Sequence, residues 1–201
     1  MHRFVAHLVI ILAIVSAVGC ASTGKQFNYQ RWSELELGKT TEADTRSLLG
    51  TPMNTSTLSN EDGTFSILRF QYVKANVVTG VASRVLICEF KDGVLNSFAY
   101  NSGFPEDSTD FDIEASQGVR VGKSTVDDVE RIVGRPTGKA RCPSMLEDYK
   151  TRCDKGSTVW LWAYTSKTKG LDVGSIRSKV FFVVFDDSGV AAHVEESRGN
   201  L

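Results

Sequence analysis

Residues 38–52 read GKTTEADTRSLLGTP, and residues 122–136 read GKSTVDDVERIVGRP. The two stretches have equal length and share their glycine, lysine and final proline positions, 84 residues apart (122 minus 38). Such self-similarity at one offset is the sequence signature of an internal repeat. We therefore expect the chain to contain two copies of one small structural unit.

Each copy carries its own helix start and stop signals. A pair of hydroxyl residues follows the glycine and lysine that open each stretch. Acidic residues come next, in the first turn, where they interact favourably with the positive end of the helix dipole. The candidate caps are Thr40 or Thr41 in the first copy and Ser124 or Thr125 in the second. Gly50 and Gly134 suit the C-terminal end, and a proline two residues later prevents continuation. The pattern predicts helices over residues 41–49 and 125–133.

Three strands should follow each of these helices. The expected strands are residues 64–74, 84–91 and 94–101 in the first copy, and residues 157–165, 179–185 and 190–196 in the second. Glycine-containing turns should close the last two strands of each copy into a hairpin. Residues 181–185 are apolar without alternation, which predicts a central strand buried on both faces. The imperfect alternation of residues 65–72 predicts a bulge near Leu68–Arg69.

A further short helix is expected before each repeated stretch. In the first copy Tyr29, Trp32 and Leu35 lie three residues apart, as one face of a helix requires. In the second copy the corresponding segment allows only a turn or two of helix. The sequence therefore predicts an α+β fold of two tandem α-α-β-β-β units, residues 29–102 and 108–198, with helices packed on one face of antiparallel sheet.

The N-terminus has the pattern of a targeting segment. His2 and Arg3 precede a nearly apolar run over residues 4–18, which is shorter than a bilayer-spanning helix and typical of a signal peptide. The run ends in small residues followed by Cys20, which resembles the lipobox of bacterial lipoproteins. We expect residues 1–19 to be a lipoprotein signal peptide, Cys20 to be acylated (palmitate among its chains), and residues 20–28 to form a lipidated tether. The alternative is an ordinary secretory signal with a chance cysteine.

The other three cysteines have different expected states. In an oxidising compartment Cys142 and Cys153, which flank a short loop, are expected to form a disulfide. Cys88 lies in a strand-like apolar segment and is expected to be a buried free thiol rather than a reactive one. The spacing of Cys142 and Cys153 suits no common zinc site.

The repeated helix signature, followed by an aromatic strand and an Asp-Gly hairpin, resembles the SmpA/OmlA (BamE-like) family of outer-membrane lipoproteins. Its tandem form also looks like the β-lactamase inhibitor protein fold. The resemblance covers about residues 30–101 and 110–198. It implies an envelope location and a protein-binding role, and Ala21 after the cysteine implies delivery to the outer membrane, on its periplasmic side. It does not transfer a partner.

The sequence offers no constellation typical of catalysis. After signal removal the one histidine is His193, which reads as a polar residue on a sheet face. Residues 122–124 resemble the end of a P-loop but read better as a helix cap. An acidic cluster follows the first unit: Asp107, Asp110, Asp112 and Glu114. It could contact calcium, but a solvated linker is the expected explanation. We expect no metal, no cofactor and no enzymatic activity.

The aromatic residues are the remaining candidates for a site. Trp160, Trp162 and Tyr164 alternate and so share one face of a strand, as Phe98 and Tyr100 do in the first copy. Trp and Tyr are enriched in binding hot spots. Either the helices cover this row, or they cover the opposite face of Leu161 and Ala163 and leave the row open to a partner.

The predicted function is binding. With 23 basic and 24 acidic residues, the chain shows no sign of nucleic-acid recognition. We expect an outer-membrane lipoprotein, held to lipid through Cys20, that acts as a scaffold or modulator in cell-envelope or β-barrel outer-membrane protein assembly. The alternative is a proteinaceous inhibitor of a periplasmic or secreted enzyme.

Overall fold

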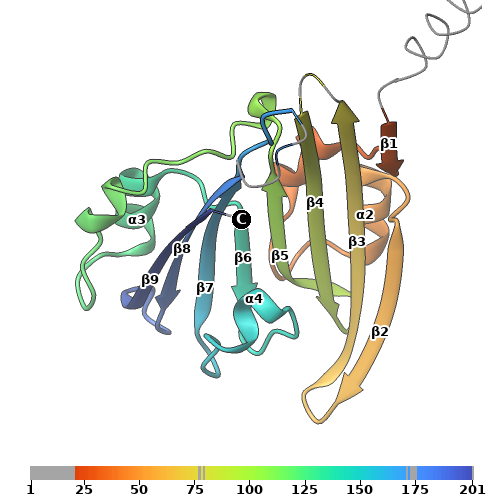
Figure 1. Ribbon diagram of the computed structural model, residues 1–201. Helices are drawn as coiled ribbons and strands as arrows, with labels where there is room; N and C mark the ends of the chain where they lie inside the picture. The colour runs from red at the N-terminus through yellow and green to blue at the C-terminus, as the bar shows by residue number, and fades with distance from the viewer. Residues whose placement is uncertain (1–20, 77, 79, 171, 173–175, 201) are drawn as a thin grey trace, which may run out of the picture.

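One antiparallel sheet of nine strands dominates the protein (Figure 1). The computed structural model describes residues 21–76, 78, 80–170, 172 and 176–200. The strands are β1 (Ala21–Gly24), β2 (Asn54–Asn60), β3 (Gly63–Asn76), β4 (Gly80–Lys91), β5 (Val94–Ser102), β6 (Gly138–Arg141), β7 (Thr158–Thr165), β8 (Arg177–Phe185) and β9 (Ala191–Asn200). Their order is β1-β3-β4-β5-β6-β7-β8-β9, and β2 pairs with the same edge of β3 as β1 does.

The helical segments are short. They are the α-helices α2 (Glu42–Leu49), α3 (Val126–Val133) and α4 (Glu147–Lys150), and the 3₁₀ turns η1 (Tyr29–Glu34), η2 (Pro105–Asp107) and η3 (Ala115–Gly118). The expected α+β fold of two α-α-β-β-β units is therefore wrong, because strands predominate and form one sheet. The spacing of Tyr29 and Trp32 by three residues fits a 3₁₀ turn, in which side chains three apart align.

The two halves nevertheless repeat the same local bonds. Thr41 and Thr125 are the caps, and each accepts the backbone N–H of the aspartate three residues later, at 3.1 and 3.3 Å. Each also forms an isolated bridge to the residue that follows the hairpin turn, Val94 or Val190. The neighbouring hydroxyls of Thr40 and Ser124 instead accept backbone N–H groups at 2.9 Å. The predicted helices are thus confirmed, and the choice between adjacent hydroxyls is settled.

The bulge is not where the sequence suggested. The register of β3 with β4 runs without interruption from Phe65 to Asn76, so Leu68–Arg69 carries no bulge. Register shifts occur instead between Glu89 and Phe90 and between Val184 and Phe185, at equivalent places in the two halves. In β3, Phe65 and Phe70 occupy opposite faces, because they are an odd number of positions apart and successive side chains of a strand alternate between its faces.

The core lies on both faces of the sheet. Two clusters cover one face: Leu49 of α2 joins side chains of β3–β5, and Val129 and Val133 of α3 join those of β7–β9. A third cluster lies on the other face beneath α4. β8 contributes to both faces, which confirms the predicted central strand, with β7 and β9 as its neighbours.

The segment expected to be a tether is partly a strand. Ala21–Gly24 forms β1 and pairs with residues 72–75 of β3, so it is held against the sheet from its first described residue. The predicted signal peptide, residues 1–19, and the predicted lipid attachment at Cys20 lie outside the described residues. Within the part of the chain that the structure describes, no helix combines the length and the apolar character needed to cross a membrane.

Candidate functional site

The aromatic row predicted to bind a partner lies in the core. Trp160 and Trp162 are 5% and 1% exposed, and Trp162 Nε1 donates to the carbonyl oxygen of Gly134 at 3.0 Å. Phe98 and Tyr100 are equally enclosed. Of the two arrangements that the sequence left open, the structure has the one in which the helical segments cover the row. These four side chains therefore offer no surface to a partner, and only Tyr164 is partly exposed.

The opposite face of the sheet carries a loop closed by a disulfide. Cys142 and Cys153 are joined, as predicted, and α4 lies within the loop. Tyr149 of α4 is fully buried, and its hydroxyl donates to the carbonyl oxygen of Phe98 at 2.6 Å. Its ring meets Phe182 edge-on, with centroids 6.4 Å apart. The loop is thus packed onto the sheet as a fixed ridge, on the side away from α2 (Figure 1).

A buried carboxylate fixes the start of this ridge. Glu89, on β4 opposite the bulge in β5, is fully buried and accepts hydrogen bonds from the Met145 backbone N–H at 2.6 Å and from Asn96 Nδ2 at 2.8 Å. The Ser144 hydroxyl also lies 3.3 Å from it. A buried carboxylate is tolerated only when such donors replace water. Sequence reasoning missed Glu89, although a charged residue inside an apolar strand was a visible signal.

Two hollows flank the ridge. One, of about 330 Å³, has Leu161, Ala163 and Phe182 in its lining, and these three side chains are only 3%, 7% and 5% exposed. On its rim Arg152 forms a two-pronged ion pair with Glu195, at 2.9 and 2.6 Å, and the guanidinium carbon lies 3.9 Å from the Phe182 ring centroid.

The second hollow, of about 390 Å³, lies on the other side of the ridge. Its lining comprises Asn54, Ser56, Ile67, Arg69, Ile87 and residues 145–148. Leu58, on the same strand as Ser56, is 46% exposed. We name the ridge (residues 142–153) and its two flanking hollows the α4 face.

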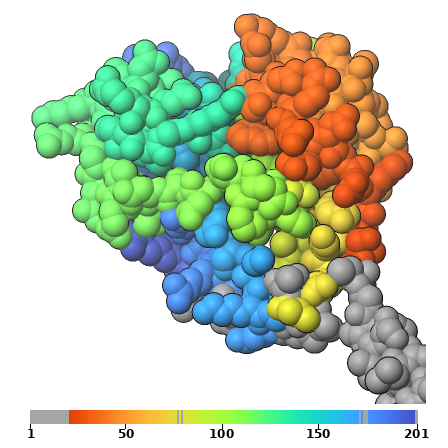
Figure 2. Space-filling view, turned by 90° about the horizontal axis from the view of Figure 1, so that it is seen from above, coloured from red at the N-terminus to blue at the C-terminus, as the bar shows by residue number. Residues whose placement is uncertain are grey.

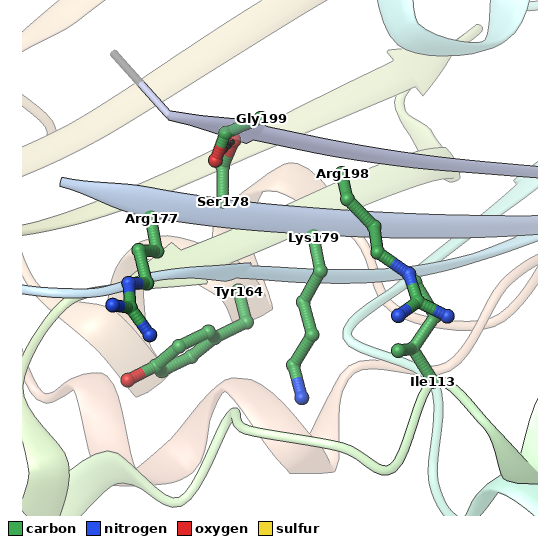
Figure 3. Close-up of a pocket in the computed structure, with 7 residues that line it drawn as sticks. All are labelled: Ile113, Tyr164, Arg177, Ser178, Lys179, Arg198 and Gly199. Carbon is green, nitrogen blue, oxygen red and sulfur yellow. Dashed lines mark hydrogen bonds between the residues drawn. The ribbon is translucent and has the colours of Figure 1, made fainter.

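A third hollow, of about 480 Å³, lies where β8 begins and β9 ends (Figure 3). Lys179 and Arg198 point into it beside Tyr164. Both cations are already paired: Lys179 Nζ lies 2.7 Å from Asp110, and Arg198 Nη1 lies 2.7 Å from Glu114. The acidic residues of the linker therefore neutralise Lys179 and Arg198, and Arg177 is a further cation in the lining of this hollow.

The four acidic residues predicted as a cluster, Asp107, Asp110, Asp112 and Glu114, belong to this linker, and each has its own partner. Asp110 and Glu114 pair as just described, Asp107 pairs with Arg84, and Asp112 accepts the backbone N–H of Glu114 at 2.9 Å. The four carboxylates thus serve four different local contacts. Among the described residues no group of three His, Cys, Asp or Glu side chains is placed to hold a metal ion.

Two further candidates for chemistry, a histidine and a free cysteine, lie on different strands. His193 is exposed on the edge strand β9. Cys88 is buried and free, as predicted, and burial raises the pKa of its thiol. A buried thiol with a raised pKa is a poor nucleophile.

The chain resembles known proteins in its fold alone, and only distantly. No protein-family model matches the chain, so none supports the SmpA/OmlA resemblance, and no curated protein matches it. The fold is similar to a crystal structure described as a "putative beta-lactamase inhibitor protein" from Streptococcus mutans. The likeness has a TM-score of 0.47 at 11% identity and covers 82% of this chain and 91% of that one. At a TM-score below 0.5 the two folds are only loosely alike.

Proposed function

We propose that the chain is a protein-binding module of the cell envelope whose partner docks on the α4 face. The observation that carries this proposal is the ridge of residues 142–153, which stands between two hollows, the second of which is lined by the partly exposed side chains of Ile67, Ile87 and Met145. Apolar contact area bordered by polar groups is the usual anatomy of a protein interface. The Arg152–Glu195 pair supplies such a polar border.

The ridge is fixed before any partner arrives. The disulfide closes it, Tyr149 anchors its centre and Glu89 holds its start. A surface that is already ordered loses little conformational entropy on binding, so more of the contact energy appears as affinity. A tight, rigid interaction is therefore the expected mode.

Of the two binding roles, we place inhibition of a periplasmic or secreted enzyme first. A rigid ridge between two hollows can enter or cover the cleft of another protein, and this needs no chemistry from the inhibitor. A scaffold or modulator role in cell-envelope or β-barrel outer-membrane protein assembly is the other candidate. In either role the chain would be attached through acylated Cys20 to the periplasmic side of the outer membrane.

Photocrosslinking with matched positions tests the docking face. A photoreactive residue is placed at Ser56 or Met145 on the α4 face, or at Arg131, whose side chain is 73% exposed on α3. We expect one protein to be captured from intact cells at both α4-face positions and not at Arg131. Capture at Ser56 should be lost when Met145→Lys is added. Capture at Arg131 alone would contradict the proposed face.

The captured partner then separates the two roles. If it is a hydrolase, the purified pair is assayed for substrate turnover with increasing amounts of the chain. Inhibition that Met145→Lys weakens supports the inhibitor role. Unchanged turnover with intact binding supports the scaffold role instead.

A further inference from the structure

The strand β1 determines where the chain leaves the folded body. Ala21 pairs with Ala75, and β3 ends one residue later at Asn76. The backbone N–H of Lys25 also donates to the carbonyl oxygen of Gln71 at 2.9 Å, so residues 21–25 all lie along β3. Cys20 is bonded directly to Ala21, and consecutive Cα atoms are about 3.8 Å apart. An anchor at Cys20 would therefore hold one particular end of the sheet close to the lipid.

That end is built from both halves of the chain. Thr168, between β7 and β8, is 2% exposed and exchanges two bonds with Val81 of β4: Val81 N–H donates to the Thr168 hydroxyl at 2.7 Å, and Thr168 N–H donates to the Val81 carbonyl at 3.1 Å. Gly80 allows this approach, because a Cβ there would overlap the Thr168 carbonyl oxygen. Figure 2 looks onto this end and shows the two segments, yellow and blue, side by side.

The exposed side chains at this end suit a lipid surface. Val78 is 81% exposed, the most exposed large apolar side chain of the described residues. Lys74, Lys167 and Arg177 are exposed and form no ion pair within the described part of the chain. The linker acids Asp110 and Glu114, by contrast, are already paired with Lys179 and Arg198. Unpaired cations near an anchor attract anionic headgroups.

We infer that this end, defined by Lys74, Val78, Lys167 and Arg177, lies on the anionic lipid surface that carries the anchor. Val78 enters the interfacial region, and the three cations contact headgroup phosphates. The α4 ridge, on a face of the sheet rather than at this end, then remains accessible to a partner (Figure 1). The inference rests on the proposed anchoring through Cys20 and is independent of the partner's identity.

Fluorescence of the labelled mature protein, purified from bacterial cells that process and acylate lipoproteins, tests the orientation. The protein is reconstituted into vesicles of phosphatidylcholine with or without phosphatidylglycerol, after an environment-sensitive dye is attached at Val78→Cys. The matched control is Val121→Cys, at a valine that is 53% exposed. Its neighbour Gly122 bonds to Ala191 at the start of β9, whereas the far end of β9 pairs with Arg177 at the proposed lipid-facing end. Wild-type protein, whose free Cys88 is buried, gives the labelling background.

The expected result is a blue-shifted emission at position 78 that brominated lipids quench, with no change at position 121. The shift should be larger with phosphatidylglycerol, and Lys74→Glu with Lys167→Glu should remove that difference. A protein that floats with vesicles but shows no response at 78, or an equal response at 121, overturns the orientation. A protein that does not float at all overturns the anchor, and with it this inference, while the crosslinking test of the α4 face is unaffected.

Discussion

Arg84 Nε donates to Asp107 Oδ2 at 2.6 Å, with side chains that are only 6% and 1% exposed. The guanidinium lies between two rings, 3.7 Å from the Tyr29 centroid and 3.8 Å from that of Phe104. The Tyr100 hydroxyl also donates to Asp107, at 2.7 Å. This pair therefore ties the linker between the two halves to the strand β4 and to the segment before the first helix.

Removing the charge of Asp107 should destabilise the protein strongly. Breaking a buried ion pair leaves the other charge uncompensated, which costs about 3 kcal/mol or more. We expect Asp107→Asn to lower the free energy of unfolding by about that amount in urea titrations. Glu106→Gln is the matched control, because Glu106 also contacts Arg84 but is 57% exposed, and its effect should be small. Equal effects of the two variants would contradict the account.

The same pair predicts a pH dependence. Burial alone would raise the pKa of Asp107, but hydrogen bonds from Arg84, Ser102 and Tyr100 outweigh it and hold this pKa below its usual range. A carboxyl with a lowered pKa in the folded state contributes stability above its unfolded pKa, which is about 3.9. That contribution is lost as the pH falls towards the folded pKa. The stability difference between wild type and Asp107→Asn should therefore be constant near neutral pH and shrink below about pH 4. A difference that grows on acidification would refute this.

The two capping residues should be equivalent. Thr41→Ala and Thr125→Ala each remove the hydroxyl that accepts the first-turn N–H, and each should cost about 1 kcal/mol of unfolding free energy. Because the sites belong to different halves, the double variant should show roughly the sum of the two. Thr51→Ala, at an exposed position outside α2, is the control and should be near neutral. Thermal or urea unfolding of the four variants and of the wild type measures these differences.

The disulfide should stabilise both the fold and the ridge. Cys142 and Cys153 are 11 residues apart, and closing so short a loop contributes about 2–3 kcal/mol. We expect the double variant Cys142→Ser with Cys153→Ser to lose about that much stability. It should also bind its partner more weakly, because residues 142–153 would then lose more conformational entropy on binding. Cys88→Ser is no useful control, because Cys88 is buried in the core. Reduction of the wild-type protein opens the same disulfide without a substitution, so it is an independent test that should have the same effect. Unchanged partner affinity after reduction would show that the ridge is not the binding element.

What the sequence predicted correctly was local. The caps, the glycines after each helix and the hairpin turns depend on neighbours within a few residues. The same signals occur in both copies of the repeat, which strengthens the prediction. Gly50 and Gly134, with φ of 92° and 90°, stand where the stop signals placed them. The burial of both faces of residues 181–185 followed from an apolar run without polar alternation.

What the sequence could not predict was non-local. β2 reads NTSTLSN and is exposed along its whole length, so no hydrophobic pattern marks it; it exists because the 14-residue β3 provides an edge to pair with. β6 has four residues, yet it joins β5 to β7 and makes the two halves one sheet. Alternation defines the two faces of a strand but not which face the helices cover. The sequence therefore leaves open whether the aromatic row is buried or exposed.

Hydrogen exchange of the complex tests the central claim most directly. Backbone exchange is measured on the purified protein with and without its captured partner. The account predicts slower exchange in residues 142–153 and in the neighbouring parts of β2, β7 and β9, with α2 and α3 unchanged. Protection confined to α2 and α3, with no change in residues 142–153, would contradict it.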